Sequence, residues 1–139
     1  MNIGIDFGNV LSILDEENKS RNLCMNMPFA LDSLFTLKSQ GHKLFLISFC
    51  GKSRPLETST AILKEYPDLF ENMFLTRAKK YKLEVYQLIC ADILIDDTLE
   101  ILQHVNNNAP NILTIHFNPQ NPIEWKCVLS QVSNIKLPT

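Results

Sequence analysis

Short apolar runs alternate with amphipathic segments along the chain. Five runs have the length and composition of buried strands: residues 2–6, 43–48, 72–75, 92–95 and 112–117. Strands that alternate with helices are typical of βαβ units and a parallel sheet covered on both faces. The pattern therefore predicts an α/β fold, a three-layer Rossmann-like sandwich of about five parallel strands. We expect the strand at residues 2–6 to lie centrally in the sheet.

The segments between these runs predict helices. Pro28 opens the first and Gly41 closes it, Ser53 caps the second and Pro67 ends it, and residues 83–90 form the third. Apolar residues at three- and four-residue steps predict the buried positions of the other helices. These positions are Leu31, Leu34, Phe35 and Lys38; Leu56, Ile62, Leu63 and Tyr66; Leu99, Leu102 and Val105; and Trp125, Val128, Leu129 and Val132.

With 139 residues, the chain has the length of one domain, which we expect to span residues 1–139. Residues 12–27 are polar and irregular, which predicts an excursion over one end of the sheet. A formal net charge of −2 argues against broad nucleic-acid binding, which needs a basic surface. Four scattered cysteines without zinc-site spacing, together with the lack of a leader or an apolar run long enough to span a membrane, predict a cytoplasmic protein.

Candidate chemistry lies where the apolar strands end. The first strand ends at Asp6, the second at Ser48, and the fourth at the pair Asp96 and Asp97. In parallel α/β sheets the carboxyl ends of the strands meet at one edge, where ligands bind. Carboxylates that meet there repel one another unless a cation or proton intervenes, and an all-oxygen ligand set favours Mg²⁺. Each residue alone could be a turn former, so the ordered set carries the prediction.

A phosphate ligand would need further groups at that edge. Lys79 and Lys80 precede the helix that leads to Asp96, so one of them can reach the same place. The Ser48 hydroxyl and the backbone N–H groups that follow it, from Phe49 to Gly51, could hold phosphate oxygens. Charge neutralisation, positioning and an in-line nucleophile are what phosphoryl transfer requires.

Four segments in this order resemble the motifs of the haloacid dehalogenase (HAD) superfamily. IDFGNVLS (5–12) is similar to motif I in its D-x-G-N-V form, and LFLIS (44–48) to motif II. KYKLEVYQ (80–87) is similar to motif III, with Tyr81 in place of proline, and ILIDDTLE (93–100) to motif IV. The resemblance covers residues 2–117 and implies a HAD-like domain.

The resemblance also implies roles for individual residues. Asp6 would be the nucleophile that forms an aspartyl-phosphate, Ser48 would bind the phosphoryl group, and Lys80 would neutralise charge. Mg²⁺ would be held by Asp6, Asp96, Asp97 and the backbone carbonyl of Gly8. The expected activity is hydrolysis of a phosphoric monoester.

Gly8 departs from this pattern, because family phosphatases usually have an aspartate there that acts as general acid and base. Asp15, Glu16 or Glu17 could substitute for it. A second reading is therefore a weak or inactive relative that binds or regulates. A receiver domain shares the chemistry, but its acidic pair normally ends the first strand.

The spacing leaves no room for a cap domain. Only 41 residues separate Asp6 from Ser48, and 31 separate Ser48 from Lys80. The site is therefore expected to be open. An open site suits a bulky phosphorylated substrate, including a macromolecule, or a homo-oligomer in which a partner supplies the lid.

Overall fold

The computed structural model describes residues 1–15, 20–21, 25–49, 55–76 and 81–135. Its centre is a five-stranded, all-parallel sheet in the order β5-β4-β1-β6-β7. The strands are β1 (Asn2–Ile5), β4 (Lys43–Phe49), β5 (Asn72–Thr76), β6 (Ile93–Asp96) and β7 (Leu113–His116). The five expected strands are confirmed, and β1 lies at the centre as predicted.

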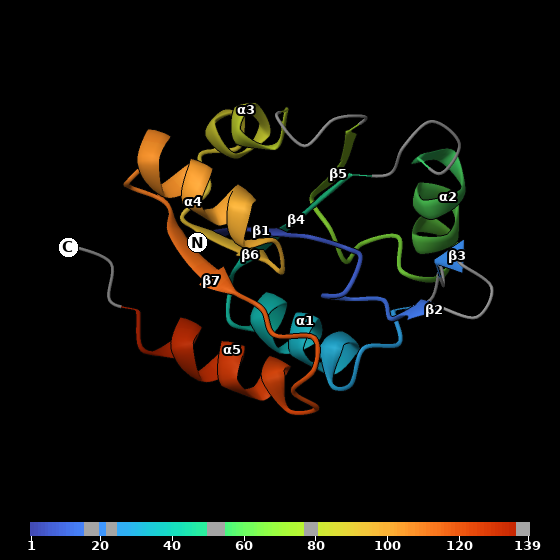
Figure 1. Ribbon diagram of the computed structural model, residues 1–139. Coiled ribbons are helices and arrows are strands. Elements are labelled where there is room, and N and C mark those ends of the chain that lie inside the picture. Colours follow the sequence, from blue (N-terminus) through green and yellow to red (C-terminus); the bar gives the residue numbers. More distant parts are fainter. Residues whose placement is uncertain (16–19, 22–24, 50–54, 77–80, 136–139) are drawn as a thin grey trace.

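Helices cover both faces of the sheet, so the fold is a three-layer α/β sandwich of the Rossmann-like type (Figure 1). The helices α1 (Ala30–Ser39) and α5 (Glu124–Ser133) pack together on one face. On the other face lie α3 (Tyr81–Leu88) and α4 (Leu99–Asn108), while α2 (Pro55–Glu65) lies next to β5. None of the helices in the described part of the chain has the length and apolar character needed to cross a membrane.

The polar excursion after β1 contains a small element that the sequence did not predict. Strands β2 (Leu14–Asp15) and β3 (Ser20–Arg21) pair in antiparallel fashion as a separate two-stranded sheet. Met27, at the end of this excursion, donates its N–H to the Leu11 carbonyl at 3.0 Å and is buried. The excursion therefore returns to the sheet beside the loop that follows β1.

Alternation along β1 divides the core into two clusters. Ile3 and Ile5 point toward α1 and α5, where Trp125 is among the residues buried with them. Gly4 faces the opposite way, toward Tyr86 of α3. A Cβ at position 4 would lie 3.0 Å from a Tyr86 ring carbon, so glycine is what allows that ring to pack directly against the sheet.

Three helix positions predicted to be buried are exposed instead: Phe35, Leu63 and Leu99. In α1 the buried side chains are Ala30, Ser33, Leu34 and Leu37. The buried face of this helix is therefore offset by one residue from the predicted face, which leaves Phe35 exposed. Leu63 lies beside the buried Ile62, and Leu99 is the first residue of its helix. Leu34, Ile62, Leu102, Val105, Trp125, Val128 and Val132 are buried as predicted; the side chain of Leu56 lies outside the described residues.

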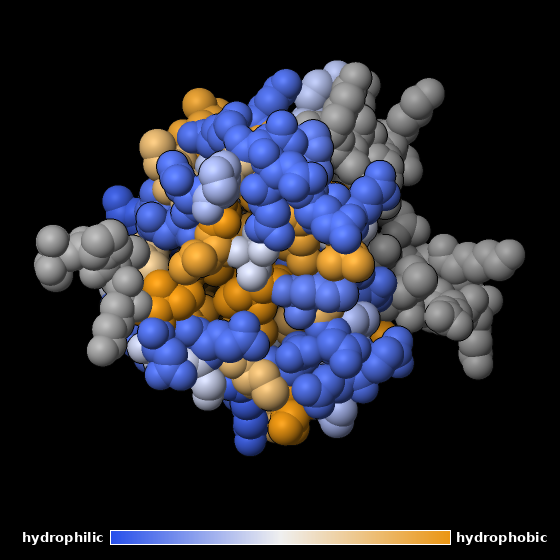
Figure 2. All heavy atoms as spheres, turned by 60° about the vertical axis from the view of Figure 1, so that its left-hand side comes forward, coloured by the Kyte–Doolittle hydropathy of each residue, from blue (hydrophilic) through white to orange (hydrophobic). Residues whose placement is uncertain are grey.

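The two ends of the sheet differ in character. The strands begin on the left in Figure 1, near the N-terminus. Figure 2 shows that side of the molecule, with apolar surface at its centre between two bands of hydrophilic side chains. At the opposite, carboxyl end of the strands lie the acidic residues that the sequence singled out.

Candidate functional site

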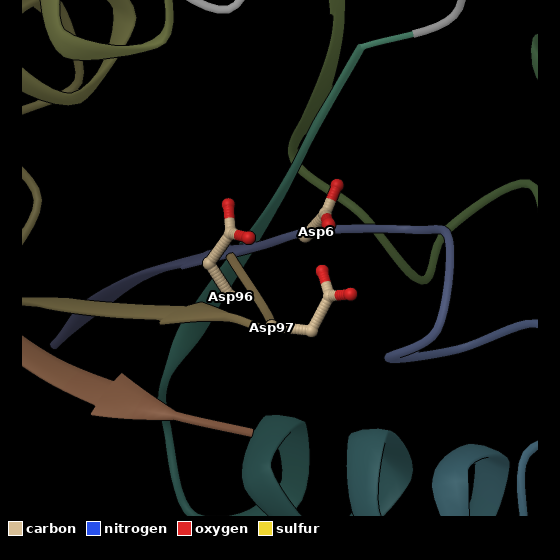
Figure 3. Close-up of side chains that lie close together, drawn as sticks. All are labelled: Asp6, Asp96 and Asp97. Carbon is tan, nitrogen blue, oxygen red and sulfur yellow. The ribbon is translucent and has the colours of Figure 1, made fainter. Parts of the chain in front are cut away.

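Three carboxylates meet at the carboxyl ends of the two central strands. Asp6 directly follows β1, Asp96 is the last residue of β6, and Asp97 comes next. One carboxylate oxygen from each lies within 4.8 Å of the others (Figure 3). The Asp6 N–H donates to the Ile95 carbonyl at 3.0 Å, which extends the pairing of β1 with β6 up to the acidic residues. Residues separated by about ninety positions are thus brought together, as the sequence predicted.

Strand alternation explains the direction in which two of these side chains point. In β6, Ile93 and Ile95 belong to the cluster beneath α1 and α5, whereas Leu94 belongs to the cluster beneath α3 and α4. Asp96 therefore falls on the face of α3. Asp6 continues the face of Gly4 in the same way. Both carboxylates thus point toward α3.

Lys82, in the first turn of α3, supplies the cation of the site. Its Nζ lies 3.1 Å from Asp6 Oδ1 and 3.1 Å from Asp96 Oδ2, and it donates a hydrogen bond to each. The Lys82 side chain is only 2% exposed. An ammonium group bound to two buried carboxylates satisfies charges that would otherwise be unfavourable in the interior.

The sequence assigned this role to Lys80, and Lys82 was missed. Lys79 and Lys80 lie outside the described residues, and α3 begins at Tyr81, two residues before the predicted start. The signal that could have found Lys82 is its spacing from Tyr86. Residues four apart lie on the same face of a helix, and both of these are buried against the sheet.

The electrostatics of the cluster depend on burial and on an excess of negative charge. Burial raises the pKa of Asp6 well above its ordinary value; Lys82 opposes the rise, while Asp96 and Asp97 add to it. Burial also works against the charge of Lys82, but Asp6 and Asp96 outweigh it, so the pKa of Lys82 is raised and it stays an ammonium. A single ammonium does not balance three carboxylates.

Asp96 and Asp97 differ in what they already bind. Asp96 is fully buried; its Oδ1 accepts the Thr98 N–H at 2.9 Å, and its Oδ2 accepts Lys82. Asp97 is half-buried, and its backbone carbonyl accepts a hydrogen bond from His116 Nε2 at 3.1 Å. Asp97 and Asp6 therefore form the more accessible side of the cluster, and Asp96 anchors it to Lys82 and α4.

A tight loop follows Asp6. The Phe7 carbonyl accepts N–H groups from Leu11 at 2.8 Å and Ser12 at 3.1 Å, and Asn9 N–H donates to the Ser12 carbonyl at 2.8 Å. Gly8 lies at the start of this loop, two residues beyond Asp6, and its backbone is not in the left-handed region. The predicted role of its carbonyl as a metal ligand stays a prediction. Of the acidic residues considered as substitutes for a general acid, Glu16 and Glu17 lie outside the described residues, as does the side chain of Asp15.

Ser48 lies in β4, the strand next to β1, and is buried. Alternation puts it on the face of Leu46, opposite to Ile47, and its carbonyl accepts a hydrogen bond from Thr76 Oγ1 at 3.4 Å. Within the described ranges no hydrogen bond joins its hydroxyl to the carboxylates. The side chain of Phe49 and residues 50–54, including Gly51, lie outside the described part. Phosphate binding by Ser48 and Phe49 stays a prediction.

One further buried polar group adjoins the cluster. The Tyr86 hydroxyl is buried and, among the described residues, has no hydrogen-bond partner. Its pKa is raised well above the ordinary value by burial and then by the charges of Asp96 and Asp6. Tyr86 therefore stays neutral.

The donor set fits a divalent cation. Three carboxylates offer hard oxygen ligands without a histidine or cysteine among them, and Lys82 leaves a net charge of about −2 to be neutralised if all are ionised. Asp6 and Asp97 present the more accessible oxygens to such an ion. The arrangement could therefore hold a metal ion.

Comparisons with known proteins do not identify the chain. No protein-family model matches it, and no functionally curated protein matches it. Among solved structures, a chain described as "Structure of MT0777" is similar over 98% of this chain and 99% of its own length, with a TM-score of 0.47 and 11% sequence identity. A likeness at this level says nothing about function.

Proposed function

We propose that this protein is a Mg²⁺-dependent phosphohydrolase of the HAD type that acts on phosphoric monoesters through an aspartyl-phosphate on Asp6. The observation that carries the proposal is the cluster of Asp6, Asp96 and Asp97 within 4.8 Å, with Lys82 bonded to two of them. The order of the four sequence motifs supports it, with Lys82 taking the role first given to Lys80. Mg²⁺, held by Asp6, Asp97 and Asp96, would neutralise charge on the phosphoryl oxygens.

In the first step an Asp6 carboxylate oxygen attacks phosphorus. A new O–P bond forms, and the bond from phosphorus to the leaving oxygen breaks with its electron pair. The Lys82 ammonium lies 3.1 Å from Asp6 Oδ1, so it holds the nucleophile in place and balances charge beside it. In the second step water attacks the same phosphorus, the Asp6 O–P bond breaks, and inorganic phosphate and a free carboxylate are released.

Gly8 limits what this site can do. With no carboxylic acid at position 8, the proposed site has no acid there to protonate the leaving oxygen, which then takes its proton from water. General acid assistance is typically worth about 10²–10⁴ in rate. The proposed enzyme therefore hydrolyses esters of acidic alcohols, such as aryl phosphates, far better than alkyl phosphates.

The test is hydrolysis of p-nitrophenyl phosphate with and without Mg²⁺ by the wild-type protein, by Asp6→Asn and by Asp68→Asn. Asp68 is exposed, so its substitution makes the same change in charge away from the site. We expect slow, Mg²⁺-dependent turnover that is lost in Asp6→Asn and kept in Asp68→Asn. Borohydride reduction during turnover should convert Asp6 to homoserine, which mass spectrometry detects.

Unchanged turnover in Asp6→Asn would rule out the covalent route. A second candidate is a binding or regulatory protein that keeps the pocket without catalysis, and Gly8 is the observation that favours it. Absence of turnover in a wild-type protein that still binds Mg²⁺ would select that candidate.

A further inference from the structure

Asp97 lies in the short turn between β6 and α4, and Lys82 does not hold it. The ion pairs in the described part of the chain join Lys82 to Asp6 and Asp96 and do not include Asp97. Asp97 is also half-buried, whereas Asp96 is fully buried. The Asp97 carboxylate nevertheless points toward that of Asp6 (Figure 3). The direction of this side chain therefore depends on the contacts of the Asp97 backbone.

The peptide unit that joins Asp97 to Thr98 is held at both of its polar atoms. Its N–H, which belongs to Thr98, donates to Asp96 Oδ1 at 2.9 Å. Its carbonyl, which belongs to Asp97, accepts a hydrogen bond from His116 Nε2 at 3.1 Å. Because a peptide unit is planar, bonds to its two opposite edges restrict its rotation and, with it, the backbone angle ψ of Asp97.

The peptide unit on the other side of Asp97 is held as well. The Asp96 carbonyl accepts the N–H of Phe117 at 2.9 Å, which extends the pairing of β6 with β7 beyond the last residue of each strand. Both peptide units that flank Asp97 are thus bonded to the end of β7, one through the Phe117 backbone and one through the His116 side chain. Of these two contacts, the His116 bond is the one that a side-chain substitution can remove.

Strand pairing places His116 for this contact. His116 pairs in register with Asp96. Its neighbour Ile115 belongs to the cluster beneath α1 and α5, so alternation puts Thr114 and His116 on the opposite face of the sheet. Thr114 Oγ1 donates to Asn106 Oδ1 of α4 at 3.0 Å, in agreement with this assignment. His116 therefore lies on the face that α4 covers, where the chain leaves β6.

We propose that His116 is a positioning residue for the metal site: its Nε2–H, bonded to the Asp97 carbonyl, holds the Asp97 carboxylate where it shares a cation with Asp6. A carbonyl oxygen only accepts, so Nε2 carries the proton in this contact. The inference rests on the proposed function, because it takes the acidic cluster to be the Mg²⁺ site. Groups that hydrogen-bond the ligands of a metal typically contribute about 10–100-fold to metal affinity or activity. Because His116 is exposed and acts through a backbone atom, we expect an effect at the lower end, about ten-fold.

Two substitutions separate the hydrogen bond from the rest of the histidine side chain. The amide nitrogen of glutamine lies about as far from the backbone as histidine Nε2, so His116→Gln can keep the donor. Asparagine carries the same amide on a side chain that is one methylene shorter, so His116→Asn removes the donor from reach. The matched control is His104→Asn, because His104 is exposed on α4 and its ring contacts Asn108.

The test measures Mg²⁺ affinity of the full chain by isothermal titration calorimetry and stability by urea unfolding without metal. We expect His116→Asn to weaken Mg²⁺ binding about ten-fold, His116→Gln to bind nearly as tightly as the wild type, and His104→Asn to be unchanged. The urea midpoints should stay close to that of the wild type, since all three substitutions are on the surface. An effect of charge would have the opposite sign, because removing a positive group beside a cation site strengthens binding.

A second measurement does not need the metal. Hydrogen exchange of the Thr98 N–H, followed by NMR, reports on the same peptide unit, because this N–H is bonded to Asp96 Oδ1. Exchange should be faster in His116→Asn and return toward the wild-type rate in His116→Gln. If neither Mg²⁺ affinity nor Thr98 exchange changes in His116→Asn, or if His116→Gln restores neither, the inference is wrong.

Failure of this inference can be told apart from failure of the proposed function. Mg²⁺ affinity that is insensitive to His116→Asn, together with p-nitrophenyl phosphate hydrolysis that depends on Asp6, would overturn the role of His116 and leave the phosphohydrolase intact. The expected order of Mg²⁺ affinities in a protein without any turnover would support the role of His116 and remove the enzyme.

Discussion

Replacing Lys82 by methionine tests the electrostatic design of the site. Two charges 3.1 Å apart attract by about 5 kcal/mol at an effective dielectric constant of about 20, and Lys82 makes two such contacts. Desolvation of the buried ions offsets several kcal/mol of this attraction. Lys82→Met keeps the length of the side chain but leaves two buried carboxylates without their cation. Breaking a buried ion pair in this way typically destabilises a protein by about 3–5 kcal/mol.

The assay is urea unfolding without divalent metal. With a slope of about 1–3 kcal/mol per molar urea, a loss of about 4 kcal/mol lowers the midpoint by roughly 2 M. Two controls separate this effect from general loss of a positive charge. Lys64→Met removes an exposed charge from α2, and Lys80→Met removes the lysine that the motif comparison favoured. Lys64→Met should stay within about 0.5 kcal/mol of the wild type.

The same variants report on catalysis. Lys82→Met should lose Mg²⁺-dependent hydrolysis of p-nitrophenyl phosphate under conditions in which it remains folded, whereas Lys80→Met and Lys64→Met should keep it. A midpoint for Lys82→Met within 0.5 M of the wild type, roughly the spread expected for a surface substitution, would refute the electrostatic reasoning. Loss of turnover in Lys80→Met but not in Lys82→Met would assign the lysine of the site to position 80.

Four further predictions follow from individual contacts. Gly8→Asp should raise turnover of alkyl phosphates by up to about 10²–10⁴ and change aryl phosphates much less, measured as kcat, because it restores a general acid. Asp97→Asn should weaken Mg²⁺ binding in a titration with little loss of stability. Asp96→Asn should also lower the urea midpoint, because Asp96 binds Lys82 and the Thr98 N–H. Tyr86→Phe removes a buried hydroxyl without a partner among the described residues, so unfolding should require about 1 kcal/mol more; a lower midpoint would show that the hydroxyl is satisfied. Burial and the N-terminal ammonium lower the pKa of His42 below 6.5. Its contribution to stability is therefore complete above the unfolded pKa and declines as the pH falls from 6.5 toward the folded pKa. His42→Asn should reduce the dependence of the urea midpoint on pH in this range, and a His42 pKa above 6.5 by NMR titration would contradict the prediction.

The sequence predicted the sheet well because buried parallel strands are nearly continuous apolar runs, and such runs are distinctive. Their polar last residues then located the acidic cluster, since strand ends in a parallel sheet share one edge. Asp6, Asp96 and Asp97 were found this way although they are far apart in the chain. Two-residue strands such as β2 and β3 are too short to leave a pattern, so they were not predicted.

Side-chain burial in helices was harder to predict, and the missed lysine has the same cause. Phe35 and Leu63 fit an apolar stripe by spacing but are exposed. In α1 the buried stripe is rotated by about one residue from the predicted one, which is about 100° on a helix. For α3, a predicted start at residue 83 excluded Lys82 from the helix altogether. The motif comparison assigned the role to Lys80, which lies outside the described residues, so that assignment stays a prediction.

The way α3 packs against the sheet accounts for the position of Lys82 beside the carboxylates. Gly4 leaves room for the Tyr86 ring, because a Cβ at position 4 would lie 3.0 Å from a carbon atom of that ring. Once that ring is seated, the face of α3 is fixed, and the residue four positions earlier is aimed at Asp6 and Asp96. The same alternation that gives Gly4 to the α3 face of β1 gives Asp6 to it. The positions of Asp6 and Lys82 and the packing of the core beside them are therefore consequences of one register between β1 and α3. A substitution that moves Tyr86 should disturb the acidic cluster without touching a carboxylate.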